Sequence, residues 1–265
     1  MTNETHNQRA FTLMYHDVVA SAERHTASGF DWPDAALYKL TRAQFDEHLT
    51  ALAAATVDAP ALVTDDAPQQ SPPRQRQQQW MLTFDDGGVS SYTEIAPRLE
   101  ARGWRGHFFV TTGVIGTAAF LNPDQIRELH ARGHIIGSHS ETHPLRMAKC
   151  SREELQREWR VSTETLAGIL GERIRVASVP GGLYSGEVAR AAAAAGIELL
   201  FTSEPTARTH SVDGCVVFGR YGIQANTPAT TAAALAAGAF APRWQQAAWW
   251  QTKKAVKTVG GTAYL

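Results

Sequence analysis

Short apolar segments alternate with helix-forming stretches along most of the chain, and this alternation restricts the fold more than any other feature. A chain that passes through a helix between successive strands builds a parallel sheet with helices over its faces. From residue 80 onward, the expected strands are Trp80–Phe84, His107–Thr111, His134–Gly137, Ile174–Val179, Ile197–Ser203 and Val216–Tyr221. The expected helices are Tyr92–Arg102, Pro123–Arg132 with Asn122 as its cap, Arg152–Leu170 and Gly186–Ala195.

The segment before residue 80 adds one strand and one helix to this series. Phe11–Val19 is apolar and rich in aromatic and β-branched residues, which predicts a buried strand. Residues 20–40 are mixed in character and predict a loop over one face. Thr41–Ala55 places apolar side chains at helical spacing behind a threonine that can cap a helix. About seven parallel strands can close on themselves, so we predict an α/β fold, a distorted (β/α) barrel in a single domain.

The domain boundaries follow from composition and length. The chain has 265 residues, which is near the upper size for one hydrophobic core. We predict a disordered N-terminus over residues 1–10, the barrel over residues 11–241 and a C-terminal helix over residues 242–265. Thr64–Gln79 is polar and rich in proline and glutamine, so we expect it to be the least ordered stretch.

The C-terminal stretch Pro242–Val259 combines tryptophans with lysines and allows two interpretations. It can form a basic amphipathic helix that touches a membrane surface or a partner. It can equally be a last helix that packs its tryptophans on the barrel, and we favour this second interpretation. The residues concerned are Trp244, Trp249, Trp250, Lys253, Lys254 and Lys257.

Charge and hydropathy exclude some classes of partner. The formal net charge is -1, which gives no electrostatic reason to expect nucleic acid or an anionic membrane as a partner. No apolar run is long enough for a transmembrane segment, and no signal peptide is visible, so we expect a cytoplasmic protein. Cys150 and Cys215 lie far apart and are expected to be free thiols. The oligomeric state is unknown from the sequence.

Two adjacent carboxylates stand at the end of an expected strand. The apolar strand that ends at Phe84 runs directly into Asp85 and Asp86, and two glycines follow. Adjacent residues at a strand end point in different directions, so one carboxylate can bind a metal ion while the other accepts a proton. An ordinary turn is the alternative, because aspartate and glycine are common turn residues.

Two histidines follow the end of another expected strand. His139 and His143 have i, i+4 spacing, and on a helical turn both rings would reach one ion. The carboxyl ends of barrel strands are also where (β/α) barrels place their active sites. Two histidines and one carboxylate suit a divalent metal ion such as Zn, Co, Ni or Fe.

These two motifs resemble those of the NodB-type polysaccharide deacetylases, carbohydrate esterase family 4. The hallmarks of that family are TFDDG and HSxxTHP-like segments, here Thr83–Gly87 and His139–Pro144. The resemblance covers roughly residues 11–225 and implies a metal-dependent amide hydrolase. By position, it makes Asp85 the catalytic base, and it makes Asp86, His139 and His143 the metal ligands.

The third motif of this family departs from its usual Arg-Pro-Pro-Tyr-Gly form. Ser178 stands where the family has the arginine that orients the catalytic aspartate. Arg220, at the end of a later expected strand, is our candidate to replace it, although a surface or core-rim arginine would look the same. Gly181 stands at the aromatic position, and its backbone N–H can still stabilise an oxyanion. Tyr184 lies just beyond and is a candidate to stack on a sugar ring, as are Trp32 and Tyr38, but the sequence does not distinguish these aromatic residues from core residues.

The family's last motif, Leu-x-x-His, is absent after residue 200, where His210 lies in a polar stretch that predicts a loop. Leu13-Met14-Tyr15-His16, at the N-terminus, resembles instead the circularly permuted poly-N-acetylglucosamine deacetylase branch. Because first and last strands are neighbours in a closed barrel, this segment would still lie beside the aspartates. His16 is then the candidate general acid, and Leu13 would line an acetyl-methyl pocket. The alternative for His16 is a core histidine.

The resemblance implies hydrolysis of an N-acetyl group on an amino sugar or oligosaccharide, in exopolysaccharide or other glycan metabolism. The missing motif arginine keeps open a carbohydrate-binding pseudoenzyme. A third alternative is an amidase of the same fold that acts on a small, lipid-linked or nucleotide-linked sugar.

Overall fold

A computed structural model describes the backbone of residues 9–63 and 79–259. Residues 1–8 of the predicted disordered N-terminus and residues 64–78 of the polar stretch lie outside the described residues. In the described part, nine strands form one curled sheet in the order β11-β1-β4-β5-β6-β7-β8-β10-β9. In that order, the strands are Tyr221–Gly222, Ala10–Tyr15, Gln79–Phe84, His107–Val110, Ile135–Ser138, Val176–Ser178, Leu199–Phe201, Cys215–Phe218 and His210–Val212.

The sheet is parallel throughout except for its antiparallel edge strand β9. One continuous segment pairs with both ends of the parallel series. Its first half, β10, pairs with β8, and its second half, β11, pairs with β1. This confirms the predicted distorted barrel of about seven parallel strands and places the first strand beside the last. The sequence predicted one strand over Val216–Tyr221, and this was wrong, because the chain changes partner strand at Gly219 and Arg220.

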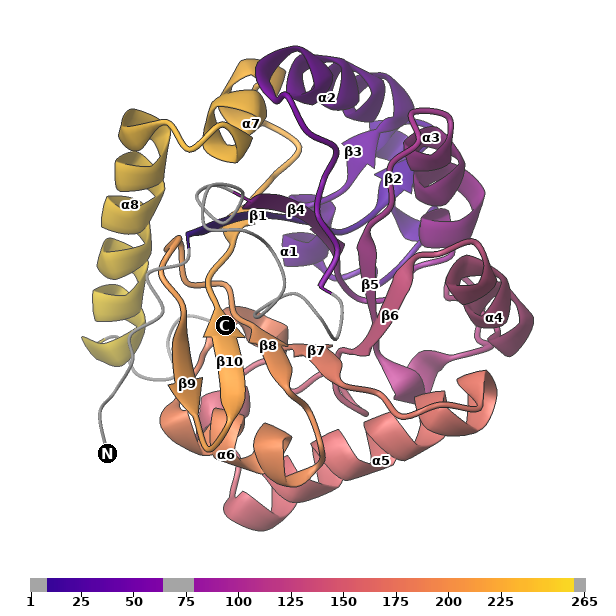
Figure 1. The fold of residues 1–265 in the computed structure, drawn as a ribbon, viewed down its shortest axis with the longest axis vertical. Coiled ribbons are helices and arrows are strands. Elements are labelled where there is room, and N and C mark those ends of the chain that lie inside the picture. The colour runs from indigo at the N-terminus through magenta and orange to yellow at the C-terminus, as the bar shows by residue number, and fades with distance from the viewer. Residues whose placement is uncertain (1–8, 64–78, 260–265) are drawn as a thin grey trace.

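Helices surround the sheet on its outer side (Figure 1). Thr41, Asn122 and Ser151 each begin a helix with a capping box, in which side chain and backbone satisfy each other's hydrogen bonds. This confirms the caps predicted at Thr41 and Asn122. In chain order, α1 to α8 span Pro33–Ala36, Arg42–Ala55, Ala96–Glu100, Pro123–Ala131, Arg152–Leu170, Gly186–Ala194, Ala229–Ala236 and Phe240–Val259.

The core has an outer layer and an inner layer. Strand residues that face the helices, such as Leu82 and Phe108, join the largest buried cluster. Their neighbours Met81 and Phe109 face the opposite way and form a smaller cluster with Phe201 inside the barrel. Both faces of β4 and β5 therefore carry buried apolar residues, as expected for strands covered on both sides.

Two stretches differ from their predicted conformation. Residues 20–40 are not a plain loop, because they contain a 3-10 segment over Ala22–Ala27 and α1. At their end, β3 (Leu40–Thr41) begins and pairs with β2 (Val18–Val19). The predicted loop at His210 is β9, which pairs with β10. Its polar residues hid this strand, because an edge strand exposes side chains that an interior strand would bury.

The C-terminal helix α8 lies along one side of the barrel (Figure 1). It contacts the barrel through the Arg243 guanidinium, which lies over the Phe11 ring, and through Gln246, which donates to the carbonyl of Gly222. Only part of the predicted tryptophan packing is seen, since Trp244 and Trp249 are 62% and 61% exposed. Within the described residues, no helix combines the length and apolarity needed to cross a membrane.

His107 shows how the barrel interior constrains protonation. It is fully buried on β5, where its Nδ1 donates to the Leu82 carbonyl and its Nε2 accepts from the Val63 N–H. This arrangement fits only the neutral ring. Burial accordingly lowers the pKa of His107 from 6.5 to about 4.

We predict that His107 makes the fold acid-sensitive. His107 is protonated more easily in the unfolded chain than in the folded protein. Its contribution to the free energy of unfolding is therefore complete above pH 6.5 and is lost as the pH falls toward about 4. Relative to His107→Gln, the native protein should lose about 3 kcal/mol of unfolding free energy between pH 7 and pH 4. Urea denaturation of both proteins across this range measures the difference, and parallel curves would contradict the assignment.

Candidate metal centre

The sequence-predicted polar residues meet at the carboxyl ends of the barrel strands. Asp85 and Asp86 follow β4, His139 follows β6, and Ser178 ends β7. These strands are neighbours in the sheet apart from β5, which lies between β4 and β6. The expectation that both motifs occupy one edge of the sheet is therefore confirmed.

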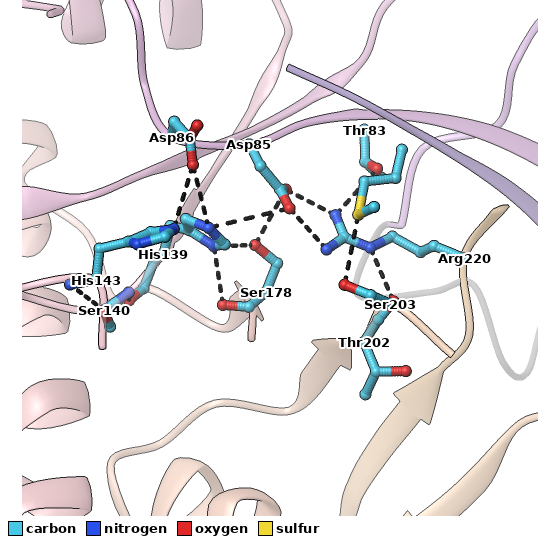
Figure 2. Close-up of polar contacts among 12 residues, drawn as sticks. Thr83, Asp85, Asp86, His139, Ser140, His143, Ser178, Thr202, Ser203 and Arg220 are labelled. Atoms are coloured by element: carbon cyan, nitrogen blue, oxygen red, sulfur yellow. Dashed lines mark hydrogen bonds and ion pairs between the residues drawn. The ribbon is translucent and has the colours of Figure 1, made fainter. Parts of the chain in front are cut away.

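Asp86, His139 and His143 converge on one point. Their potential ligand atoms all lie within 4.8 Å of one another. Oδ1 of Asp86 is 3.5 Å from Nε2 of His139 and 3.4 Å from Nε2 of His143 (Figure 2). All three side chains are almost completely buried. Two imidazole nitrogens and one carboxylate oxygen form a donor set that suits Zn, Co, Ni or Fe, so these residues fit a divalent ion.

Unusual backbone conformations bring the three side chains together. Asp86, Ser140 and His143 have φ values of 75°, 66° and 58°, in the left-handed region that residues with a Cβ rarely adopt. The turn at Asp86 redirects a side chain that regular alternation would point away from Asp85. The predicted helical turn at His139 and His143 was wrong, because the i, i+4 pair lies on an irregular loop.

The loop that carries both histidines is tied to helix α5. The Glu158 carboxylate accepts hydrogen bonds from the backbone N–H groups of Glu141 and Thr142, at 3.0 and 2.8 Å. It also accepts from the Thr142 hydroxyl at 2.6 Å. Glu158 is only 4% exposed, so this carboxylate stabilises the loop from inside. Sequence analysis missed this residue, since a glutamate on a long helix normally indicates a solvent-exposed face.

The two histidines are held differently. Nδ1 of His139 lies 2.6 Å from the hydroxyl of Ser178 and 3.1 Å from its carbonyl oxygen, which directs Nε2 toward Asp86. Such a second partner is the usual means of orienting a metal-binding histidine. Nδ1 of His143 is buried without a hydrogen-bond partner among the described residues. Its ring packs instead against Phe30 and Trp32.

Arg220 takes the place that the sequence motif left empty. Its guanidinium donates two hydrogen bonds to Asp85, each 2.7 Å long, and a third to the carbonyl of Thr202. Figure 2 shows the Asp85 carboxylate between this guanidinium and the His139 ring. Ser178, which stands at the expected arginine position, also reaches Asp85 at 3.2 Å.

The charges around Asp85 and Asp86 keep both carboxylates ionised. Burial alone would raise the pKa of Asp85, but the nearby Arg220 and His139 outweigh it and lower that pKa below its usual value. For Asp86, burial is outweighed by hydrogen bonds from His139 and His143, and its pKa falls well below the usual range. His16 lies close enough to contribute to the lowering of both pKa values.

His16 lies where the barrel closes. The chain around it is fixed by the hydrogen bond from the Asp85 N–H to the Tyr15 carbonyl, which extends the β1–β4 pairing into the site. The His16 ring packs on Tyr38 at a centroid distance of 4.6 Å, and its Nδ1 has no hydrogen-bond partner among the described residues. The predicted neighbourhood of His16 and the aspartates is confirmed; its acid role stays a prediction.

Leu13 does not face the site. It is fully buried in the outer cluster, on the side of β1 that packs on the helices, together with Phe11 and Tyr15. Our expectation that it lines an acetyl-methyl pocket does not fit this orientation. Met14 points the other way, and its Sδ accepts a hydrogen bond from the Ser203 hydroxyl. The sequence could not separate these two residues, because both faces of the strand are apolar.

Gly181 and Tyr184, the remaining two candidate substrate-binding residues, lie in different surroundings. Gly181 has φ 66°, and a Cβ there would overlap the backbone of Leu145, two residues beyond His143, so the turn requires glycine and touches the metal-site loop. Tyr184 contacts His210 through a 3.1 Å hydrogen bond and packs at the edge of the cluster between the sheet and α6. The contacts described for Tyr184 therefore lead away from the metal site.

Comparisons with known proteins agree with this geometry. Residues 73–200 match the sequence model of a family described as polysaccharide deacetylase. Just under half of the chain is therefore similar to polysaccharide deacetylases. This match contains Asp85, Asp86, His139 and His143, whereas His16 and Arg220 lie outside it.

Individual relatives cover the same region. The chain is 33% identical over 103 residues to a chitin deacetylase of Colletotrichum lindemuthianum, covering 38% of this chain and 42% of that protein. It is 31% identical over 118 residues to a chitooligosaccharide deacetylase of Sinorhizobium fredii, covering 44% of this chain and 53% of that protein. The chain thus matches only about half the length of these curated relatives.

Solved deacetylase structures share the fold over a longer stretch. The Streptococcus pyogenes deacetylase PplD superimposes with a TM-score of 0.66 at 21% identity, covering 82% of this chain and 93% of that one. IcaB from Ammonifex degensii gives a TM-score of 0.66 at 21% identity, covering 87% and 98%. At this identity the likeness shows the fold alone, and it extends beyond the deacetylase sequence match.

The Arg220–Asp85 pair should be strongly coupled in stability. Removing one partner leaves a buried charge unpaired, so Arg220→Met should destabilise the fold by about 3–5 kcal/mol. In an Asp85→Asn background the same substitution should cost much less. Arg42→Met, which removes the half-exposed partner of Glu94, serves as a control and should cost about 1 kcal/mol or less. Urea denaturation of the full cycle measures these values, and additive effects would contradict the coupling.

Proposed function

We propose that the protein removes N-acetyl groups from an amino sugar, as part of an exopolysaccharide or another glycan, by metal-dependent hydrolysis. The observation that supports this proposal most is that Asp85, which Arg220 orients, lies beside the cluster of Asp86, His139 and His143. A metal cluster alone would fit a structural site. A second carboxylate held beside it, and kept out of the cluster by its own arginine, supports chemistry at the site.

Asp86, His139 and His143 would hold the divalent ion, which in such sites polarises a carbonyl and lowers the pKa of a bound water. Asp85 is the proposed general base. Both of its oxygens accept from Arg220, which fixes the plane of the carboxylate, and Oδ2 lies on the side of His139, 4.0 Å from its Nε2. The attacking water would give its proton to this carboxylate as it adds to the amide carbon.

The remaining roles fall to the rim of the site. The backbone N–H of Gly181 is the proposed donor to the oxyanion of the tetrahedral intermediate. His16, protonated, would donate to the leaving amine nitrogen, so that the C–N bond breaks to release acetate and the free amine.

The main argument for the alternative interpretation, a carbohydrate-binding pseudoenzyme, no longer holds. It rested on the serine at the motif arginine position, but Arg220 supplies the guanidinium from another strand end. An amidase of the same fold that acts on a small, lipid-linked or nucleotide-linked sugar shares all of the catalytic groups. It differs only in substrate, so an assay of several acetylated sugars separates it from the proposal.

We expect the chelated protein to release no acetate from N-acetylglucosamine oligomers, and added Zn, Co or Ni to restore release. Asp86→Ala should abolish both metal binding and release, because it removes a ligand. His16→Ala should keep the metal and lose activity. Acetate is measured enzymatically and metal by calorimetry. Metal binding without release from any acetylated sugar would contradict a sugar deacetylase, and no metal binding would contradict the enzyme altogether.

Asp85→Asn isolates the proposed base. General base catalysis contributes about 10²–10⁴-fold, so kcat should fall by at least about tenfold while the affinity for zinc is kept. The asparagine keeps one oxygen that can accept a hydrogen bond from Arg220, whereas both oxygens of Asp85 accept one. A fall smaller than about tenfold at saturating zinc would remove Asp85 from the role of base.

A further inference from the structure

The segment of residues 20–39 brings three aromatic side chains to the metal centre, and we call it the mouth segment. The rings of Phe30 and Trp32 are stacked, with centroids 4.2 Å apart and planes at 15°. They lie 4.9 and 5.3 Å from the His143 ring. Tyr38 lies against the proposed acid, His16, with ring centroids 4.6 Å apart. The mouth segment thus borders both the metal cluster and the proposed acid.

Trp32 is accessible to solvent although it touches a metal-site residue. It is 37% exposed, whereas the tryptophans of the barrel, Trp80, Trp104 and Trp159, are at most 8% exposed. Phe30 beneath it is partly buried and also contacts Phe120, which fixes the inner side of the stack. The Trp32 indole rests on Phe30 and is open to solvent beside a polar site. It can therefore offer an apolar surface to a ligand.

The mouth segment is held in place before any ligand arrives. The ammonium of Lys39, which is 5% exposed, donates to the carbonyl oxygens of His25, Ser28 and Phe30, and so closes the backbone into a loop. Three hydrogen bonds from one cation to one loop are costly to break. The position of Phe30, and therefore of the stack, follows from this arrangement.

A second anchor ties the mouth segment to the Asp85–Asp86 turn. Oδ1 of buried Asp17 accepts hydrogen bonds from the hydroxyls of Ser28, at 2.5 Å, and Ser90, at 2.7 Å. A Cβ at Gly29 or Gly88 would overlap this carboxylate, so both backbones approach it as only glycine allows. The mouth segment and the metal site are therefore joined by a buried carboxylate, and the aromatic surface is preorganised.

We propose that the Phe30–Trp32 stack is a binding platform for a pyranose ring of the substrate, next to the ring that carries the acetyl group. The C–H face of a pyranose ring is apolar and packs on a flat aromatic surface while its hydroxyls remain in water. Exposed Asp31 and Asp34 flank Trp32, so the platform suits a neutral or amine-bearing sugar rather than an anionic one. The inference rests on the proposed deacetylase function and predicts that the protein prefers oligomers to the monomer.

The test compares Trp32→Ala and Trp32→Phe with the native protein. Trp244→Ala is the matched control, since Trp244 is 62% exposed on α8. Substrates are the N-acetylglucosamine monomer and tetramer with saturating zinc, and zinc affinity is measured separately by chelator competition. We expect Trp32→Ala to raise KM for the tetramer about tenfold or more. We expect kcat, the monomer KM and the zinc affinity to change less than about twofold, and Trp32→Phe to restore part of the tetramer binding.

Two results would overturn the platform. One is an unchanged tetramer KM in Trp32→Ala. The other is a loss of zinc affinity with equal effects on monomer and tetramer, which would mean that the stack only orients His143. If the native protein releases no acetate, the proposed function fails on its own. Calorimetric titration with the tetramer then decides the platform, because equal Kd values for the native protein and Trp32→Ala would refute it.

Discussion

The ion pair between Arg220 and Asp85 joins the architecture of this protein to its chemistry. Arg220 lies at the point where one segment leaves β8 and turns to β1, so its side chain enters the barrel from the place where the sheet closes. A buried ion pair is stable only when its remaining hydrogen bonds are satisfied. Here the guanidinium also donates to the carbonyl of Thr202 and the hydroxyl of Thr83, which come from opposite sides of that junction. Arg220 can therefore orient Asp85 only when the barrel has closed correctly.

The metal centre depends on a backbone that is locally unfavourable. Three residues with side chains adopt left-handed conformations at Asp86, Ser140 and His143, and each costs on the order of 1–3 kcal/mol. The surrounding structure supplies compensation through hydrogen bonds to the loop, above all those to the Glu158 carboxylate. The same logic holds for the mouth segment, where Lys39 satisfies three carbonyl groups. Ordered irregular backbone, rather than helix or strand, positions the groups that would meet a substrate.

The sequence predicted the barrel and the four residues of the Asp and His motifs, because hydrophobic alternation and polar residues at strand ends are local signals. It also suggested Arg220, although only as one of two alternatives. What failed depended on tertiary structure. The strand pattern could not show that Leu13 faces the helices, because both faces of β1 are buried. The spacing of His139 and His143 suggested a helical turn, and no local sequence signal predicts a positive φ at a histidine. The role of Glu158 arises from where α5 packs, which no single segment of sequence contains.

The pairing of β1 with β11 has a consequence for the order in which the protein can assemble. Leu13 pairs with Tyr221, so two strands that are made early and late in synthesis must lie side by side. Contacts between residues so distant in sequence are slow to form, since loop closure must precede any gain from them. His16 directly follows β1, and Arg220 lies between β10 and β11. A nascent chain can thus carry Asp86, His139 and His143 before Arg220 has been made, so the orientation of Asp85 depends on a part of the chain that is added later.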